Sequence, residues 1–160
     1  MKQSSVDQAD LKKWVRFCLE RAVLVSFKYD SLFSAVFQSE HGSRTIEATL
    51  AIGSQFWVSG TAVGAESSLK EQDRPEQAFH LMTLVGRTVR SVALESSSIL
   101  LVFEPEGTLE VSGLSQVWDF AWHLGVPAQE ANEESVSVDC ASDGELFCSW
   151  ENDFAAHLAG

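Results

Sequence analysis

Residues 45–52 carry the clearest periodicity in the chain, with apolar side chains at every second position from Ile46 to Ile52. This alternation predicts a half-buried β-strand, because successive side chains of a strand point to opposite faces. Shorter β-favouring runs, separated by turn residues such as His41-Gly42 and Gly53-Ser54, cover residues 25–29, 33–37, 56–58, 88–94, 99–103 and 108–111. The spacing predicts two antiparallel meanders. Residues 99–103 are apolar on both faces, which predicts a central strand covered on each side.

Three segments have helical periodicity instead. Apolar residues over 5–22 recur at spacings of three and four, which predicts an amphipathic helix. Shorter helices are predicted over 75–84, with Phe79 and Met82 buried, and over 115–124, which contains Trp118 and Trp122. We therefore expect an α+β fold: antiparallel β-meanders with an N-terminal helix and two shorter helices packed on the sheet.

A chain of 160 residues suits a single domain with a core of its own. A Gly-, Ser- and Glu-containing loop at 61–73 marks two possible halves, 1–60 and 74–160. The last hairpin has two candidate registers. A two-residue turn pairs Val138 with Ser149, whereas a three-residue loop over 143–145 places Cys140 opposite Cys148, and the hydrophobic pattern favours the second. Three cysteines are too few for a disulfide framework or a zinc site, so buried thiols are expected.

Charge is distributed very unevenly along the chain. The net charge is −12, yet residues 1–90 hold all 11 Lys and Arg against 10 Asp and Glu. Residues 91–160 hold 13 acidic residues and no Lys or Arg, so this half carries −13. Such a half disfavours nucleic acid, anionic membranes and phosphate-rich ligands, and it suits a basic protein surface.

Catalytic signatures are missing from the sequence. His41, His80, His123 and His157 each stand alone, without the spacing of a metal-binding or catalytic motif. No phosphate-binding loop, dinucleotide fingerprint or nucleophile elbow occurs. We therefore expect no enzyme activity, no cofactor and no metal.

Acidic residues in the second half are interleaved with large aromatic side chains, including Trp118 and Phe147. Aromatic anchors within an acidic surface are typical of sites that bind basic proteins, because they combine desolvated contact area with fast, selective association. The alternative is a solvated negative surface that keeps the protein soluble and monomeric. The predicted partner-binding residues are Glu104, Glu106, Asp119, Trp122, Asp139, Asp143, Glu145, Trp150, Glu151 and Asp153.

The segment 84–92 (LVGRTVRSV), the run 99–111 (ILLVFEPEGTLEV) and the Trp-bearing stretch that follows resemble small bacterial α+β domains of unknown function. Such domains occur among the immunity proteins of polymorphic toxin systems. The resemblance covers about a quarter of the chain. It implies a protein without catalytic residues that binds a cognate basic toxin and blocks its active site or substrate path.

Two other functions remain open. An adaptor or secretion-chaperone-like protein would form a dimer with a hydrophobic groove. A small-ligand-binding domain or enzyme would have a concave pocket with convergent polar groups and perturbed pKa values. The N-terminus lacks the apolar core of a signal peptide, and no apolar run approaches the ~18–20 residues of a membrane span, so we expect a cytoplasmic protein.

Overall fold

The computed structural model describes residues 7–29, 32–64, 79–116, 118–127 and 135–148. These residues form one N-terminal helix, α1 (Gln8–Leu19), a short helical turn at 79–82 and an eleven-stranded antiparallel sheet. The strands are β1 (Val23–Tyr29), β2 (Phe33–His41), β3 (Arg44–Ile52), β4 (Gln55–Val58), β5 (Thr61–Gly64), β6 (Thr88–Glu95), β7 (Ser98–Glu104), β8 (Thr108–Val111), β9 (Phe120–Val126), β10 (Val136–Ala141) and β11 (Leu146–Cys148).

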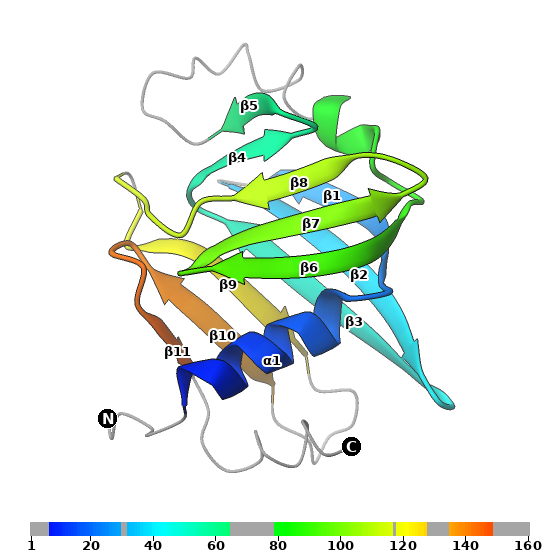
Figure 1. The fold of residues 1–160 in the computed structure, drawn as a ribbon, viewed down its shortest axis with the longest axis horizontal. Coiled ribbons are helices and arrows are strands. Elements are labelled where there is room, and N and C mark those ends of the chain that lie inside the picture. Colours follow the sequence, from blue (N-terminus) through cyan, green and yellow to red (C-terminus); the bar gives the residue numbers. More distant parts are fainter. Residues whose placement is uncertain (1–6, 30–31, 65–78, 117, 128–134, 149–160) are drawn as a thin grey trace.

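The sheet has the order β11-β10-β9-β3-β2-β1-β6-β7-β8-β4-β5 and folds over on itself. Figure 1 shows two layers, with β6, β7, β8, β4 and β5 in front of β1, β2, β3, β9 and β10. The layers join at β1 and β6, which share a single bridged pair, Val23 with Thr88. Strands from the two halves of the chain interleave, since β3 pairs with β9 and β4 pairs with β8.

Helix α1 covers the part of the inner face that the front layer leaves open, below β6 in Figure 1. The side chain of Asp7 caps its first turn by accepting a hydrogen bond from the Ala9 amide at 3.2 Å. One apolar stripe of the helix enters the core, as its periodicity predicts: Leu11, Trp14, Val15, Cys18 and Leu19.

Several predicted elements are confirmed. Helix α1 lies within the predicted 5–22 segment, and β6, β7 and β8 match the runs at 88–94, 99–103 and 108–111. The hairpin of β2 and β3 turns at Gly42, where the backbone has φ +65°, a conformation that glycine adopts without strain. In each of these cases the local pattern and the tertiary environment favour the same element.

The predicted α+β class is wrong, because the shorter helices do not pack on the sheet as expected. Residues 120–126 form β9, which pairs with β3 on one side and β10 on the other. A strand there satisfies the backbone hydrogen bonds of both neighbours, which a helix cannot do. Trp122 and Leu124, two residues apart, are both fully buried on the core face of this strand.

In the predicted 75–84 helix, residues 79–82 are helical, and residues 75–78 lie outside the described part of the chain. The buried face differs from the prediction. Phe79 and Met82 are 65% and 59% exposed, whereas Leu81 and Leu84 are fully buried. The chain reaches β6 through this segment, so its orientation follows the start of that strand rather than the local apolar spacing.

The last hairpin adopts a third register. Val138 lies opposite Cys148, and Cys140 lies opposite Leu146, so the predicted Cys140–Cys148 pairing is wrong. The loop covers residues 142–144, and the Ala141 amide donates to the Glu145 carbonyl at 2.8 Å. A shift of two residues leaves each side chain on its predicted face, because side chains alternate with a period of two.

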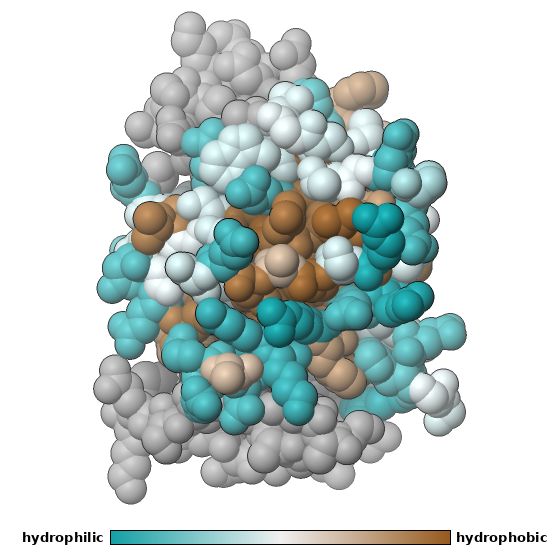
Figure 2. Space-filling view, in the orientation of Figure 1, coloured by the Kyte–Doolittle hydropathy of each residue, from teal (hydrophilic) through white to brown (hydrophobic). Residues whose placement is uncertain are grey.

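Strand β7 is central but is uncovered on its outer face in the part of the chain described here. Ile99, Leu101 and Phe103 enter the core, whereas Leu100 is 37% exposed. Figure 2 shows hydrophobic surface over the middle of β6 and β7, where Ala93 pairs with Leu100. The prediction of a strand covered on both faces is therefore wrong for the described residues.

Candidate functional site

Within the described part of the chain, the acidic residues that the sequence singles out lie in two separate places. Glu104 and Glu106 are exposed at the β7–β8 turn, at one end of β7. The β10–β11 turn lies near the other end of β7, because Gly144 packs against Ser97. A strand of this length spans about 20 Å, so Glu104 and Glu106 cannot share a compact surface with the acids of the β10–β11 turn.

Trp122 belongs to the core rather than to a binding surface. Its side chain is fully buried, and its indole Nε1 donates a hydrogen bond of 2.8 Å to the Ser97 carbonyl of the β6–β7 turn. This bond links the back layer of the sheet to the front layer. The other predicted residues of the C-terminal end, Trp150, Glu151 and Asp153, lie outside the described residues.

A surface with both exposed acids and exposed apolar side chains forms where the segment before β9 meets the β10–β11 turn. The Ser142 amide donates to the Asp119 carbonyl at 3.1 Å, and the Ser115 amide donates to the Ser142 carbonyl at 3.0 Å. Leu114 packs against Gly144 in the turn, yet remains 61% exposed, and Trp118 is 36% exposed. We call this surface the acidic edge; it consists of Leu114, Trp118, Asp119, Asp143 and Glu145.

Next to the acidic edge, three residues line up across the outer face of β9, β10 and β11. His123 lies opposite Asp139, and Asp139 lies opposite Phe147. Directly opposed residues share a face of the sheet, with Cβ atoms about 4.5–5.5 Å apart. We call Phe147, Asp139 and His123 the histidine row. It adjoins the acidic edge because Glu145 and Phe147 lie two residues apart along the chain.

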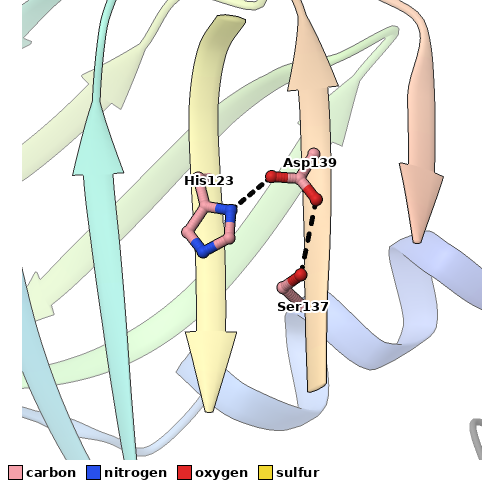
Figure 3. Close-up of polar contacts among 3 residues, drawn as sticks. All are labelled: His123, Ser137 and Asp139. Carbon is pink, nitrogen blue, oxygen red and sulfur yellow. Dashed lines mark hydrogen bonds and ion pairs between the residues drawn. The ribbon is translucent and has the colours of Figure 1, made fainter. Parts of the chain in front are cut away.

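His123 and Asp139 form a hydrogen-bonded ion pair across these strands (Figure 3). Asp139 accepts from the Nδ1–H of His123 through one carboxylate oxygen and from the Ser137 hydroxyl, at 3.4 Å, through the other. The hydrogen bond that His123 donates to Asp139 raises the pKa of His123. Partial burial of the ring lowers this pKa, and the negative charge of Asp139 raises it further. Asp139 therefore favours the protonated ring.

The orientation of the His123 ring depends on Gly125. A Cβ atom at position 125 would lie 3.0 Å from Nε2 of His123, so the ring lies over the glycine. When His123 is neutral with its proton on Nδ1, Nε2 is a hydrogen-bond acceptor. The serine contacts the aspartate rather than the histidine, so these three residues do not form a nucleophilic triad.

Sequence reasoning treated His123 as an isolated residue and left it out of the site. Asp139 is 16 positions away, and only the pairing of β9 with β10 brings the two together. A helix over 115–124 could not pair with β10, so the predicted helix excluded this contact. The alternation of Val136, Val138 and Cys140 is the one local signal that places Asp139 on the outer face of β10.

A second feature bears on the small-ligand alternative. An open depression of about 520 Å³ lies between the β4–β5 turn, the β7–β8 turn and the segment before β6. Apart from Gly107, the residues that line it have polar or charged side chains, and the Arg87 guanidinium there donates to the Glu106 carbonyl at 2.7 Å. Ligand pockets of this volume are usually lined by apolar side chains with a few polar groups. The lining residues are Ser59, Thr83, Arg87, Glu106, Gly107 and Thr108.

Metal and thiol chemistry have little support in the described residues. No three or more His, Cys, Asp or Glu side chains among them come together as a metal site. Burial raises the pKa of the Cys18 thiol and that of the Cys140 thiol, the latter to about 11, so both stay protonated at neutral pH. Among the helical residues described, none form a helix long and apolar enough to span a membrane.

Comparison with known proteins identifies no relative of this chain. No model of a protein family, no curated protein and no solved structure matches the chain.

Proposed function

We propose that the chain is a non-enzymatic acidic binding protein that holds a basic protein partner, as an immunity or inhibitor protein holds the toxin it neutralises. The binding surface would be the acidic edge together with the histidine row. The observation that carries the proposal is the exposure of Leu114, Trp118 and Phe147 beside exposed carboxylates, in a half of the chain without Lys or Arg.

The two kinds of side chain have different tasks in such a surface. Large apolar groups supply most of the binding free energy when a partner covers them, and these three are 61%, 36% and 47% exposed. Exposed ion pairs contribute only about 0–1 kcal/mol each, but a field of one sign accelerates association and rejects acidic competitors. The proposal therefore assigns affinity to the apolar groups and selectivity to the acids.

A pull-down with the tagged protein from lysate of the source cells tests this function. The test variant, Asp119→Asn with Asp143→Asn and Glu145→Gln, removes three charges from the acidic edge. The control variant, Glu104→Gln with Glu106→Gln, removes two exposed charges at the other end of β7. We expect one basic protein that the wild type and the control retain and the test variant loses.

Salt concentration provides the second readout. Between 0.1 M and 1 M salt the Debye length falls from about 10 Å to about 3 Å, so charge-steered capture should slow or disappear. Equal capture by all three proteins at both salt concentrations would contradict the role of the acidic edge. Capture of nothing at either concentration would contradict the whole proposal and direct attention to the depression around Arg87.

The captured protein also distinguishes an inhibitor from an adaptor. If it is toxic when expressed alone and co-expression of this chain restores growth, the chain is an immunity protein. If the chain binds it without changing its activity, the adaptor function is correct. Size-exclusion chromatography of the chain alone adds to this test, since the adaptor alternative predicts a dimer.

A further inference from the structure

The histidine row combines three contact types on one side of the sheet. Phe147 offers an aromatic ring that is 47% exposed, Asp139 offers a carboxylate, and His123 offers a ring that is 42% exposed. Because Phe147 opposes Asp139 and Asp139 opposes His123, the three side chains occupy adjacent positions on one face. A flat cation rich in hydrogen-bond donors matches these three contact types.

The acceptors in this row are held in place before any ligand arrives. Asp139 is only 16% exposed and is fixed by His123 on one oxygen and Ser137 on the other. Its hydrogen bond with Nδ1 also sets the neutral tautomer of His123, in which Nε2 accepts. The absence of a side chain at Gly125 leaves room for Nε2 over that residue.

We propose that the histidine row is a subsite for one arginine side chain of the basic partner. The guanidinium would stack on the Phe147 ring and donate hydrogen bonds to the Asp139 carboxylate and to Nε2 of His123. Arginine fits better than lysine, because its planar group carries five donors in a fixed fork and stacks on aromatic faces. The subsite rests on the proposed function, since it identifies what the partner presents to this surface.

Charges around His123 make the subsite dependent on pH. On β10 the facing charge is Asp139, and beyond it Glu145 lies just before β11. On β3 the neighbours Ala51 and Thr49 do not titrate, and the first charged residue on that face is Glu47. Protonation of His123 converts Nε2 from acceptor to donor and adds a positive charge, so arginine binding should weaken as the pH falls.

Nuclear magnetic resonance titration of the wild-type chain tests the subsite directly. The probe is N-acetyl-arginine amide, and the controls are N-acetyl-lysine amide and N-acetyl-citrulline amide, which matches arginine in shape but has no charge. We expect arginine at pH 8 to shift the ring nitrogens of His123 and the amides of Asp139 and Phe147. Lysine should bind at least threefold more weakly, citrulline should have no effect, and at pH 5 arginine should bind at least tenfold more weakly.

Two variants complete the test. Asp139→Asn should abolish the shifts, and Gly125→Ala should weaken them by crowding Nε2 without changing any charge. Glu110→Gln, which removes an exposed acid from β8, outside the acidic edge and the histidine row, is the control and should bind arginine as the wild type does. Unfolding midpoints measured in urea verify that each variant is folded.

Three results would overturn the subsite. They are equal shifts with lysine, shifts spread over all exposed acids, and unchanged binding at pH 5. The subsite and the proposed function can fail separately. If the Asp139→Asn variant still captures the partner and the triple acidic-edge variant loses it, the arginine subsite is contradicted and the proposed function is not.

Discussion

Substitution of Trp122 by phenylalanine is the sharpest test of where the aromatic residues of the second half lie. The indole is fully buried, and its Nε1–H donates to the Ser97 carbonyl at 2.8 Å. Phenylalanine cannot donate, so this carbonyl, in a residue that is 6% exposed, loses its partner. An unsatisfied buried acceptor costs about 1–3 kcal/mol.

The smaller ring adds a second cost. Complete truncation of a buried aromatic residue to alanine costs about 3–5 kcal/mol, and phenylalanine leaves only a fraction of that cavity, which we place at about 1 kcal/mol. The two contributions lower the free energy of unfolding by about 2–4 kcal/mol. With a urea dependence of about 2 kcal/mol/M, the unfolding midpoint falls by about 1–2 M.

Urea unfolding followed by far-ultraviolet circular dichroism measures this shift without relying on tryptophan fluorescence. Trp118→Phe is the matched control, because Trp118 is 36% exposed and most surface substitutions change stability by less than about 0.5 kcal/mol. If Trp122→Phe moves the midpoint by no more than Trp118→Phe does, the hydrogen bond between the layers and the core position of Trp122 are refuted.

Three further outcomes are expected. Asp139 raises the pKa of His123 above the unfolded value of about 6.5. The pair therefore stabilises the fold most below about pH 6.5, and this stabilisation is lost as the pH rises through the folded pKa. His123→Gln should lower the urea midpoint at pH 5.5 and change it less at pH 8.5. Equal changes at both values would contradict this pair. Gly113→Ala should lower the free energy of unfolding by at least about 2 kcal/mol in thermal melts, because its Cβ would lie 2.1 Å from a serine hydroxyl of the β6–β7 turn. In the control Gly42→Ala, the new Cβ has nothing within 4 Å, so the free energy of unfolding should fall only by the ~1–2 kcal/mol that the positive φ costs. Cys18 and Cys140 should react with a disulfide reagent at pH 8 only after unfolding, and fast labelling of either in the native protein, read by mass spectrometry, would contradict their burial.

Local patterns predicted the elements whose surroundings agree with their own preferences. The stripe of α1 and the alternation in β3 each bury one face, so periodicity alone identifies them. The segment at 115–124 misled because an apolar spacing of three and four does not distinguish a helix from an irregular strand. Cys140 pairs with Trp122 and Ala141 pairs with Phe120, so Ala121 is an extra residue in β9 at a β-bulge. Ala121 and Trp122 are consecutive and both buried, which breaks the simple alternation of a strand.

Charge and chemistry of the candidate surface follow from the sequence by itself. The lack of Lys and Arg after Arg90 and the interleaving of acids with aromatic residues hold for any fold, because they are properties of composition and order. Only the tertiary structure decided which of these residues share a surface. Trp122 and Asp139 both lie in the acidic half, yet one is buried and the other faces outward beside His123. The reason is physical: strand register and layer packing set side-chain neighbours between residues distant in sequence, and no local periodicity encodes them.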